Sequence, residues 1–225
     1  MVGLPTPLYH LSSSQTNAVY DPSEDSFLLL DALEKDADEI RKLQPLIVVE
    51  VGCGTGIASS FVAKMVNHLA YSFASDINPT AAECCRTTAA MNSVQIDVLC
   101  CDLLSPLQDR LAGFVDILLF NPPYVPTDEQ PRNALDYSWS GGLYGRATLD
   151  RFLPHVPSLL SDNGSFYLVA LKSNNVPYLL SHTPLLDGHI VLERRCGMEY
   201  LYVLKFVKKA NSENVRKELS SDISD

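Results

Sequence analysis

Short apolar segments alternate with amphipathic segments along most of this chain. The pattern predicts strands over 46–51, 70–75, 94–100, 115–120 and 165–171. Between them, apolar positions recur at a spacing of three or four residues, which is the period of a helix. Apolar strands separated by helices indicate a mostly parallel sheet with helices on both faces, so we predict an α/β fold.

The first predicted helix carries a start signal and a stop signal. Asp21 can cap a helix, Pro22 suits its first position, and Glu24 lies where a capping box places its acid. Helical spacing continues after these residues, and we expect the helix to end before Pro45. Further helices are predicted over 57–67, 79–91, 147–160 with kinks at its two prolines, and 175–181.

The C-terminal part of the chain departs from this alternation. Residues 125–145 are rich in Pro, Gly and Asp, so we expect a long loop there. Two further strands, 189–195 and 199–207, are separated by three residues that include Gly197, which is typical of an antiparallel hairpin. The sheet is therefore predicted to end in an antiparallel pair.

Composition favours one globular domain. Of 225 residues, 46% are hydrophobic and 20% are charged, and this length fits a single domain. We predict a flexible segment over 1–19, a single domain over 20–207 and a disordered polar tail over 208–225. No apolar run approaches the roughly 18 residues of a membrane helix, and no secretory signal is recognised. We expect a cytoplasmic protein without membrane contact, and leave action in the nucleus open.

Charge and cysteine usage disfavour two classes of site. The chain has 17 basic and 27 acidic residues, a net charge of −10, whereas DNA-binding proteins gain most of their affinity from Lys and Arg. A nucleic-acid substrate is therefore disfavoured, although a local basic patch stays open. The six cysteines form no CxxC pair and have no His at zinc-ligand spacing, so we expect reduced core cysteines and no metal site.

A glycine-rich turn follows the first predicted strand. Its sequence runs from Glu50 through Gly52, Gly54 and Gly56 into a helix. Glycines let the backbone approach a ligand at the carboxyl end of a strand. The spacing lacks the usual third glycine of the dinucleotide fingerprint and adds an acid before the glycines. A simple tight turn between strand and helix is the alternative.

Acids follow the next two predicted strands. Asp76 could hold both hydroxyls of a ribose, or could cap a helix, although Asn78 before Pro79 is better placed for that. Asp102 could accept a hydrogen bond from an adenine amino group while Leu103 packs on the ring. Its alternative is a loop carboxylate that faces water.

The fourth strand ends in Asn121-Pro122-Pro123-Tyr124. Two prolines cannot continue a central strand, because neither has an N–H group to donate. The exit therefore has a fixed shape and presents an amide, two carbonyls and an aromatic ring. Such a group can hold a planar amino group: Asn121 through its side-chain oxygen, Pro122 through its carbonyl, and Tyr124 by packing on the plane. A rigid turn without chemistry is the alternative.

Together these motifs would open on one edge of a sheet. The combination resembles the class I S-adenosylmethionine-dependent methyltransferases. With Asn121-Pro122-Pro123-Tyr124 it is similar to the HemK/PrmC family of protein glutamine N5-methyltransferases. Within that family the sequence most resembles the eukaryotic release-factor methyltransferases. The resemblance spans Tyr20 to Val207 and includes the segments 21–30, 76–79, 139–142 and 145–146. It implies a Rossmann-like seven-stranded sheet with an antiparallel last strand.

The resemblance also implies roles for individual residues. S-adenosyl-L-methionine is the implied cofactor. Its methionine end maps to Ser26, Glu50, Gly52 and Gly54, its ribose to Asp76, its adenine to Asp102 and Leu103, and its reactive end to Asn121. Trp139 and Arg146 are weaker candidates for contact with the substrate.

The implied partners are a release factor as substrate and a small zinc-binding activator subunit in a heterodimer. The bacterial members carry an N-terminal helical domain that has no counterpart in this sequence, so substrate docking must differ. Other functions stay open: an N6-adenine nucleic-acid methyltransferase, a protein lysine methyltransferase, and a nucleotide-binding protein or dinucleotide oxidoreductase without transferase activity.

Overall fold

The computed structural model describes residues 3–67, 69–128, 131–182 and 185–209. Its centre is a sheet of β1 (Ile47–Val51), β2 (Tyr71–Asp76), β3 (Asp97–Cys100), β4 (Val115–Phe120), β5 (Leu160–Leu171), β6 (Leu186–Cys196) and β7 (Glu199–Lys208). The seven strands lie in the order β3-β2-β1-β4-β5-β7-β6. The first five are parallel, and β7 is antiparallel to both of its neighbours, which confirms the predicted fold class.

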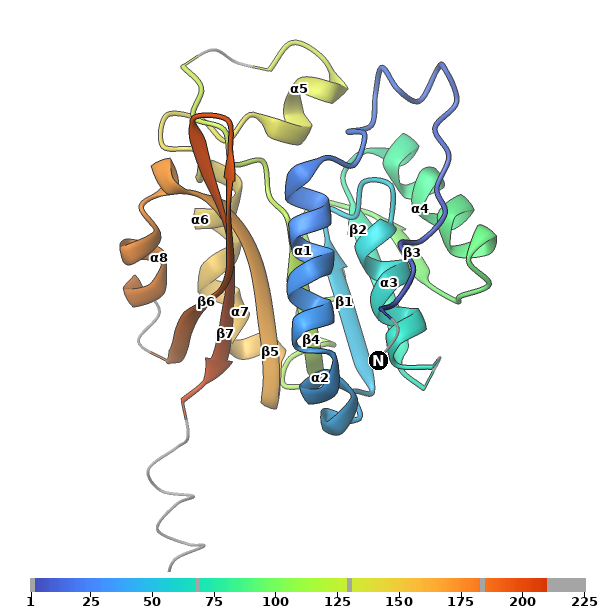
Figure 1. Cartoon of the computed structure of the whole chain (residues 1–225), viewed down its shortest axis with the longest axis vertical. Helices are drawn as coiled ribbons and strands as arrows, with labels where there is room; N and C mark the ends of the chain where they lie inside the picture. Colours follow the sequence, from blue (N-terminus) through green and yellow to red (C-terminus); the bar gives the residue numbers. More distant parts are fainter. Residues whose placement is uncertain (1–2, 68, 129–130, 183–184, 210–225) are drawn as a thin grey trace, which may run out of the picture.

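Helices cover both faces of this sheet (Figure 1). One face carries α1 (Glu24–Lys35), α2 (Ala37–Leu43), α3 (Ile57–Met65) and α4 (Pro79–Met91). The other carries α6 (Ala147–Phe152), η1 (Leu153–His155), α7 (Val156–Leu159), η2 (Lys172–Asn174) and α8 (Val176–His182). The short α5 (Ala134–Trp139) lies beyond the carboxyl ends of the strands (Figure 1).

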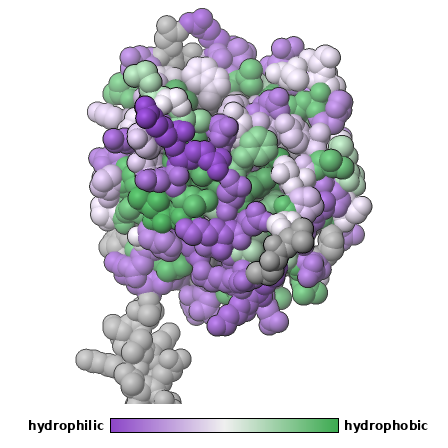
Figure 2. All heavy atoms as spheres, viewed as in Figure 1, coloured by the Kyte–Doolittle hydropathy of each residue, from purple (hydrophilic) through white to green (hydrophobic). Residues whose placement is uncertain are grey.

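Side chains of the central strands alternate between two cores, as the pleat requires. In β1, Val48 packs with α1 and α3, whereas Val49 and Val51 pack with α6 and α7. Hydrophilic and hydrophobic residues are intermixed on the outer surface on the side that carries α1 (Figure 2). The central parallel strands β1 and β4 are thus buried on both faces, which explains why their sequences are mostly apolar, whereas the edge strand β3 is not buried.

The predicted first helix is wrong in its start and in its continuity. Ser23, not Asp21, is the residue before α1, and Asp21 instead accepts a hydrogen bond from the Tyr9 hydroxyl at 3.0 Å. The helix breaks at Asp36 into α1 and α2. The Asp36 carboxylate accepts hydrogen bonds from Tyr167 at 2.8 Å and Lys205 at 3.0 Å, so distant strands hold the break in place.

Other predicted boundaries shift for local reasons. The predicted loop 125–145 contains α5, whose first turn Asn133 caps by accepting from the Asp136 N–H at 3.0 Å. The strand predicted from Val94 begins only at Asp97, because the Val94 N–H donates to the Ala89 carbonyl at the end of α4. The predicted kinks in 147–160 are confirmed, since the helix divides into α6, η1 and α7.

The N-terminal segment contacts the domain at several points. The Leu4 N–H donates to Glu34 at 2.8 Å, the Leu8 N–H donates to Asn92 at 2.9 Å, and Val19 is buried against α4. The flexibility of 1–19 and the domain boundaries stay predictions. The tail predicted to be disordered lies outside the described residues beyond position 209, and its first residue, Lys208, belongs to β7.

Cysteine placement corrects one expectation. Cys53, Cys84 and Cys85 are buried, as expected of core cysteines. Cys100 is exposed and lies on the edge strand β3, so it is not a core residue. All six thiols are free of disulfides.

Candidate active site

A cavity of about 510 Å³ opens at the carboxyl ends of the parallel strands. The chain reverses its strand order between β1 and β4, and ligands of open α/β sheets bind at such a point. The volume lies within the usual range for small-molecule sites. The residues predicted from the sequence to be catalytic or to bind the cofactor all line this cavity: Ser26, Glu50, Gly52, Gly54, Asp76, Asp102, Leu103, Asn121, Pro122 and Tyr124.

The glycine turn after β1 has a backbone that only glycine adopts easily. Gly52, Gly54 and Gly56 have φ values of 66°, 50° and 76°. A side chain on Gly56 would also lie 2.8 Å from the Cys85 Cα atom, so α4 approaches too closely for any other residue. The turn is therefore fixed by conformation and by packing against the neighbouring helix.

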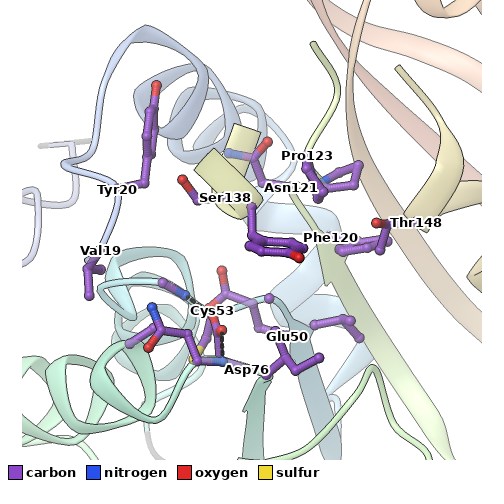
Figure 3. A pocket seen from close by; sticks show the side chains of 18 of the residues that line it. Val19, Tyr20, Glu50, Cys53, Asp76, Phe120, Asn121, Pro123, Ser138 and Thr148 are labelled. Atoms are coloured by element: carbon purple, nitrogen blue, oxygen red, sulfur yellow. Dashed lines mark hydrogen bonds between the residues drawn. The ribbon is translucent and has the colours of Figure 1, made fainter. Parts of the chain in front are cut away.

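Asp76 holds this turn from the end of β2. Its Oδ2 accepts from the Gly54 N–H at 2.9 Å (Figure 3), and its Oδ1 accepts from the Asn78 N–H at 2.8 Å. Burial raises the pKa of Asp76, while these backbone donors oppose that rise. Asn78 caps α4 by accepting from the Thr80 N–H, as predicted. Asp76 thus links two loops and still lines the cavity.

Glu50 is a buried acid with a structural partner. It lies on the face of β1 toward α3, where its Oε2 accepts from the Ser59 N–H at 2.9 Å and from the Ser59 hydroxyl. Burial raises the pKa of Glu50 to about 7, and the Ser59 donors act in the opposite direction. Glu50 therefore satisfies a backbone donor in the first turn of α3 besides lining the cavity.

The elbow after β4, residues 121–124, presents an unpaired oxygen. The Asn121 Nδ2 donates to Asp25 at 2.9 Å, whereas the Asn121 Oδ1 is buried without a hydrogen-bond partner. Asn121 lies across the cavity from Glu50 and Asp76 (Figure 3). A buried polar atom without a partner costs free energy, so this oxygen is available to accept a hydrogen bond from a ligand.

Asp25 and Tyr20 surround this elbow, and the sequence motifs did not assign them to the site. The Tyr20 hydroxyl donates to Asp25 at 3.2 Å, and the Tyr124 hydroxyl lies close enough for the charge of Asp25 to act on it. Burial, and then the charge of Asp25, raise the pKa of Tyr20 to about 12 and the pKa of Tyr124 further. Both phenols therefore stay protonated at neutral pH. A signal for Asp25 was present in the sequence, because it lies in the segment 21–30 that carries the family resemblance, and Tyr20 directly precedes that segment.

The far end of the cavity contains an ion pair. Asp102 pairs with Arg151 of α6 at 2.5 Å and its side chain is 45% exposed, so the alternative of a loop carboxylate that faces water stays open. Leu103 has a φ of 53°, in the left-handed region that leucine rarely adopts. Such strain is concentrated at functional positions. Arg151 lines the cavity and was also missed, because nothing near it in sequence marks it.

The two weaker candidates for substrate contact differ in whether they line the cavity. Trp139 lines the cavity from α5 and is 37% exposed, as expected of a residue at its mouth. Arg146 is absent from the lining. Its guanidinium lies 4.4 Å from the centre of the Tyr178 ring and donates to the Asn174 carbonyl. Arg146 therefore supports the loop and is not a contact of the cavity.

The described residues contain neither a candidate metal site nor a helix that could span a membrane. Within them, no group of three or more His, Cys, Asp and Glu side chains could hold a metal ion. Over the same residues, none of the helices has the length and apolar character needed to cross a bilayer.

Comparison with known proteins gives consistent matches. A family model described as methyltransferase small domain matches residues 20–137. Methyltransferase HEMK2 of Mus musculus is 44% identical over 210 residues, which cover 91% of this chain and 97% of that protein. The eRF1 methyltransferase catalytic subunit mtq2 of Schizosaccharomyces pombe is 37% identical over 211 residues, which cover 86% of this chain and 91% of that protein.

A solved structure agrees with these relatives. The Mtq2–Trm112 complex of E. cuniculi, whose description assigns it the methylation of the eRF1 translation termination factor, is 27% identical and superposes with a TM-score of 0.63. The match covers 85% of this chain and 99% of that chain. The chain therefore belongs to the methyltransferase small domain family, together with the HEMK2 and mtq2 methyltransferases.

Proposed function

We propose that this chain transfers a methyl group from S-adenosyl-L-methionine to the side-chain amide nitrogen of a glutamine in a translation termination factor. The observation that carries the proposal is the buried, unpartnered Oδ1 of Asn121, a residue that lines the cavity. The names of two relatives support the acceptor: the eRF1 methyltransferase catalytic subunit mtq2, and a Methanocaldococcus jannaschii protein named "Putative protein N5-glutamine methyltransferase", which is 36% identical over 148 residues.

The cavity fits the cofactor by the chemistry of its lining. Asp76 supplies a carboxylate for two ribose hydroxyls, and Asp102 with Leu103 supplies an acceptor and an apolar surface for adenine. The glycine turn, Ser26 and Glu50 line the part of the cavity assigned to the methionine end. When bound, S-adenosyl-L-methionine supplies an electrophilic methyl group carried on a sulfonium.

The residues of the elbow act on the acceptor nitrogen. A carboxamide nitrogen is a poor nucleophile, because its lone pair is shared with the carbonyl. Asn121 Oδ1 accepts one N–H of the target amide, the Pro122 carbonyl accepts the other, and Tyr124 packs against the amide plane. As the nitrogen bonds to carbon its hydrogens become more acidic, so these acceptors favour the transition state over the ground state. The released proton passes to water.

A small activator subunit is proposed as the partner. The E. cuniculi relative is a complex of Mtq2 with Trm112, and the present chain matches nearly all of its catalytic chain. We extend this arrangement to a heterodimer with a zinc-binding activator. Cytoplasmic localisation is part of the same proposal, since translation termination takes place there.

The experiment uses the chain co-expressed with a Trm112-type subunit, radiolabelled cofactor and four acceptors: a termination-factor complex, a lysine-rich peptide, DNA and RNA. Label in a single glutamine of the factor is expected. Label only in nucleic acid, which the net charge of −10 disfavours, or only in lysine, would contradict the proposal.

Asn121→Ala tests the role of the elbow. Turnover is expected to fall by about 100-fold, the usual loss when one preorganised hydrogen bond to a transition state is removed. Affinity for S-adenosylhomocysteine, measured by calorimetry, should change by less than about threefold. Asn17→Ala, at an exposed asparagine outside the cavity, is the control and should retain activity. Wild-type turnover by Asn121→Ala would remove the assigned role.

A further inference from the structure

We infer that Asp25 is a positioning residue that sets which end of the Asn121 amide faces the cavity. The inference rests on the proposed function and adds a residue that acts through Asn121 without touching the acceptor. Asp25 lies in the first turn of α1 and Asn121 follows β4, 96 residues later. Their hydrogen bond between Nδ2 and Oδ2 measures 2.9 Å.

The surroundings of Asp25 are unusual for a buried acid. Asp25 is buried, with only 3% of its surface exposed. It accepts from the Asn121 amide at 2.9 Å, from the Tyr20 hydroxyl at 3.2 Å and from the Ser26 hydroxyl at 3.5 Å. These three donors are neutral groups. A buried carboxylate satisfied by neutral donors is costly to maintain, which suggests a purpose beyond stability.

The chemistry of the carboxylate decides the orientation of Asn121. The two ends of an asparagine amide have nearly the same shape, and only hydrogen bonding distinguishes them. An ionised carboxylate only accepts hydrogen bonds, so it can face the NH2 end and repels the oxygen end. With Nδ2 directed at Asp25, Oδ1 is left unpaired, which is the observed state.

The reverse orientation would be unproductive. It would direct the Asn121 NH2 group toward the NH2 group of a target glutamine, and two donors cannot bond to each other. Without Asp25, both orientations become accessible, and part of the population presents the wrong end. Asp25 therefore contributes to turnover through the fraction of enzyme in which the acceptor oxygen faces the cavity.

Kinetics of four variants test this coupling: Asp25→Ala, Asp25→Asn, Asn121→Ala and the Asp25→Ala/Asn121→Ala double variant. Asp25→Ala should lower kcat by about 10- to 100-fold, the range that follows loss of positioning. Asp25→Asn retains an acceptor oxygen for Asn121 and should fall between Asp25→Ala and the wild type. The double variant should be no slower than Asn121→Ala alone, because the two residues act as one unit.

Two controls separate positioning from folding. Affinity for S-adenosylhomocysteine should stay within about threefold of wild type in each variant, since Asp25 is assigned to the acceptor side. Asp31→Ala removes another acid of α1, which is exposed and paired with Arg194, and should leave kcat unchanged. Wild-type kcat in Asp25→Ala, or multiplicative losses in the double variant, would overturn the inference.

A spectroscopic readout tests the inference without turnover. The side-chain NH2 resonances of Asn121, assigned by their absence in Asn121→Ala, should exchange slowly with solvent in the wild type because they bond to a buried carboxylate. They should exchange faster in Asp25→Asn. Rapid exchange in the wild type would overturn the inference even if Asp25→Ala does not fold. If the wild type methylates no glutamine while these resonances are protected, the proposed function fails and the orientation of Asn121 stands.

Discussion

Glu50 shows how one residue can serve both the fold and the site at a cost in stability. Its carboxyl group is buried at the end of β1, and burial raises its pKa from 4.5 to about 7. The ionised form is therefore disfavoured in the folded protein relative to the unfolded chain. The free energy of unfolding therefore carries no penalty from Glu50 below pH 4.5, where the group is protonated in both states. It falls as the pH rises from 4.5 through about 7, where the folded protein must also lose the proton.

Glu50→Gln should consequently stabilise the protein at high pH. Glutamine resembles the protonated acid and can still accept from the Ser59 N–H. The gain in unfolding free energy should be absent below pH 4.5 and reach about 3 kcal/mol above pH 7, following the shift from 4.5 to about 7. Denaturant unfolding at the two pH limits measures it. Glu83→Gln, an exposed control, should show no such dependence, and an equal effect of Glu50→Gln at both limits would contradict burial of the charge as the cause.

At the scale of elements, the glycine turn between β1 and α3 is restricted in two ways: by its left-handed backbone and by close packing against α4. Gly54 and Gly56 both have positive φ, yet only Gly56 faces a neighbouring helix. Gly54→Ala should cost about 1–2 kcal/mol, the penalty for a left-handed alanine. Gly56→Ala should cost clearly more, because its Cβ would meet Cys85. Equal losses in denaturant unfolding would show that α4 does not restrict the turn.

The break between α1 and α2 depends on a buried cation of β7. Lys205 is 2% exposed and pairs with Asp36 at 3.0 Å and Glu39 at 2.8 Å. Lys205→Ala should destabilise the protein by about 3–5 kcal/mol, because it leaves Asp36 without its cation. Lys208→Ala on the same strand is the control and should change stability by less than about 1 kcal/mol, because its partner Asp162 is exposed and 3.9 Å away. A small loss in Lys205→Ala would contradict this role.

The same elements differ in how far a sequence can predict them. The bounds of β4 and the start of α4 depend on neighbouring residues: an apolar run stopped by two prolines, and an asparagine cap before Pro79. The break at Asp36 could not be predicted, because it depends on Tyr167 and Lys205, which are 131 and 169 positions away. Asp25 lies in the segment 21–30 that carries the family resemblance, but its contact with Asn121 could not be predicted, because the two residues are 96 positions apart.

At the scale of the whole molecule, the topology assembles the site from motifs spread over a hundred residues. Parallel strands β1, β2, β3 and β4 all end at one edge, so their terminal residues meet around one cavity. Each motif alone is compatible with a simple turn or cap. Their convergence is what distinguishes a cofactor site from a set of unrelated turns.

The most direct test of the proposed reaction is tandem mass spectrometry of a purified termination factor after incubation with this chain, a Trm112-type subunit and S-adenosyl-L-methionine. One methyl group is predicted on the side-chain nitrogen of a single glutamine, absent when Asn121→Ala replaces the wild type. A factor that stays unmodified, or that carries the methyl group on lysine alone, would contradict the proposed function.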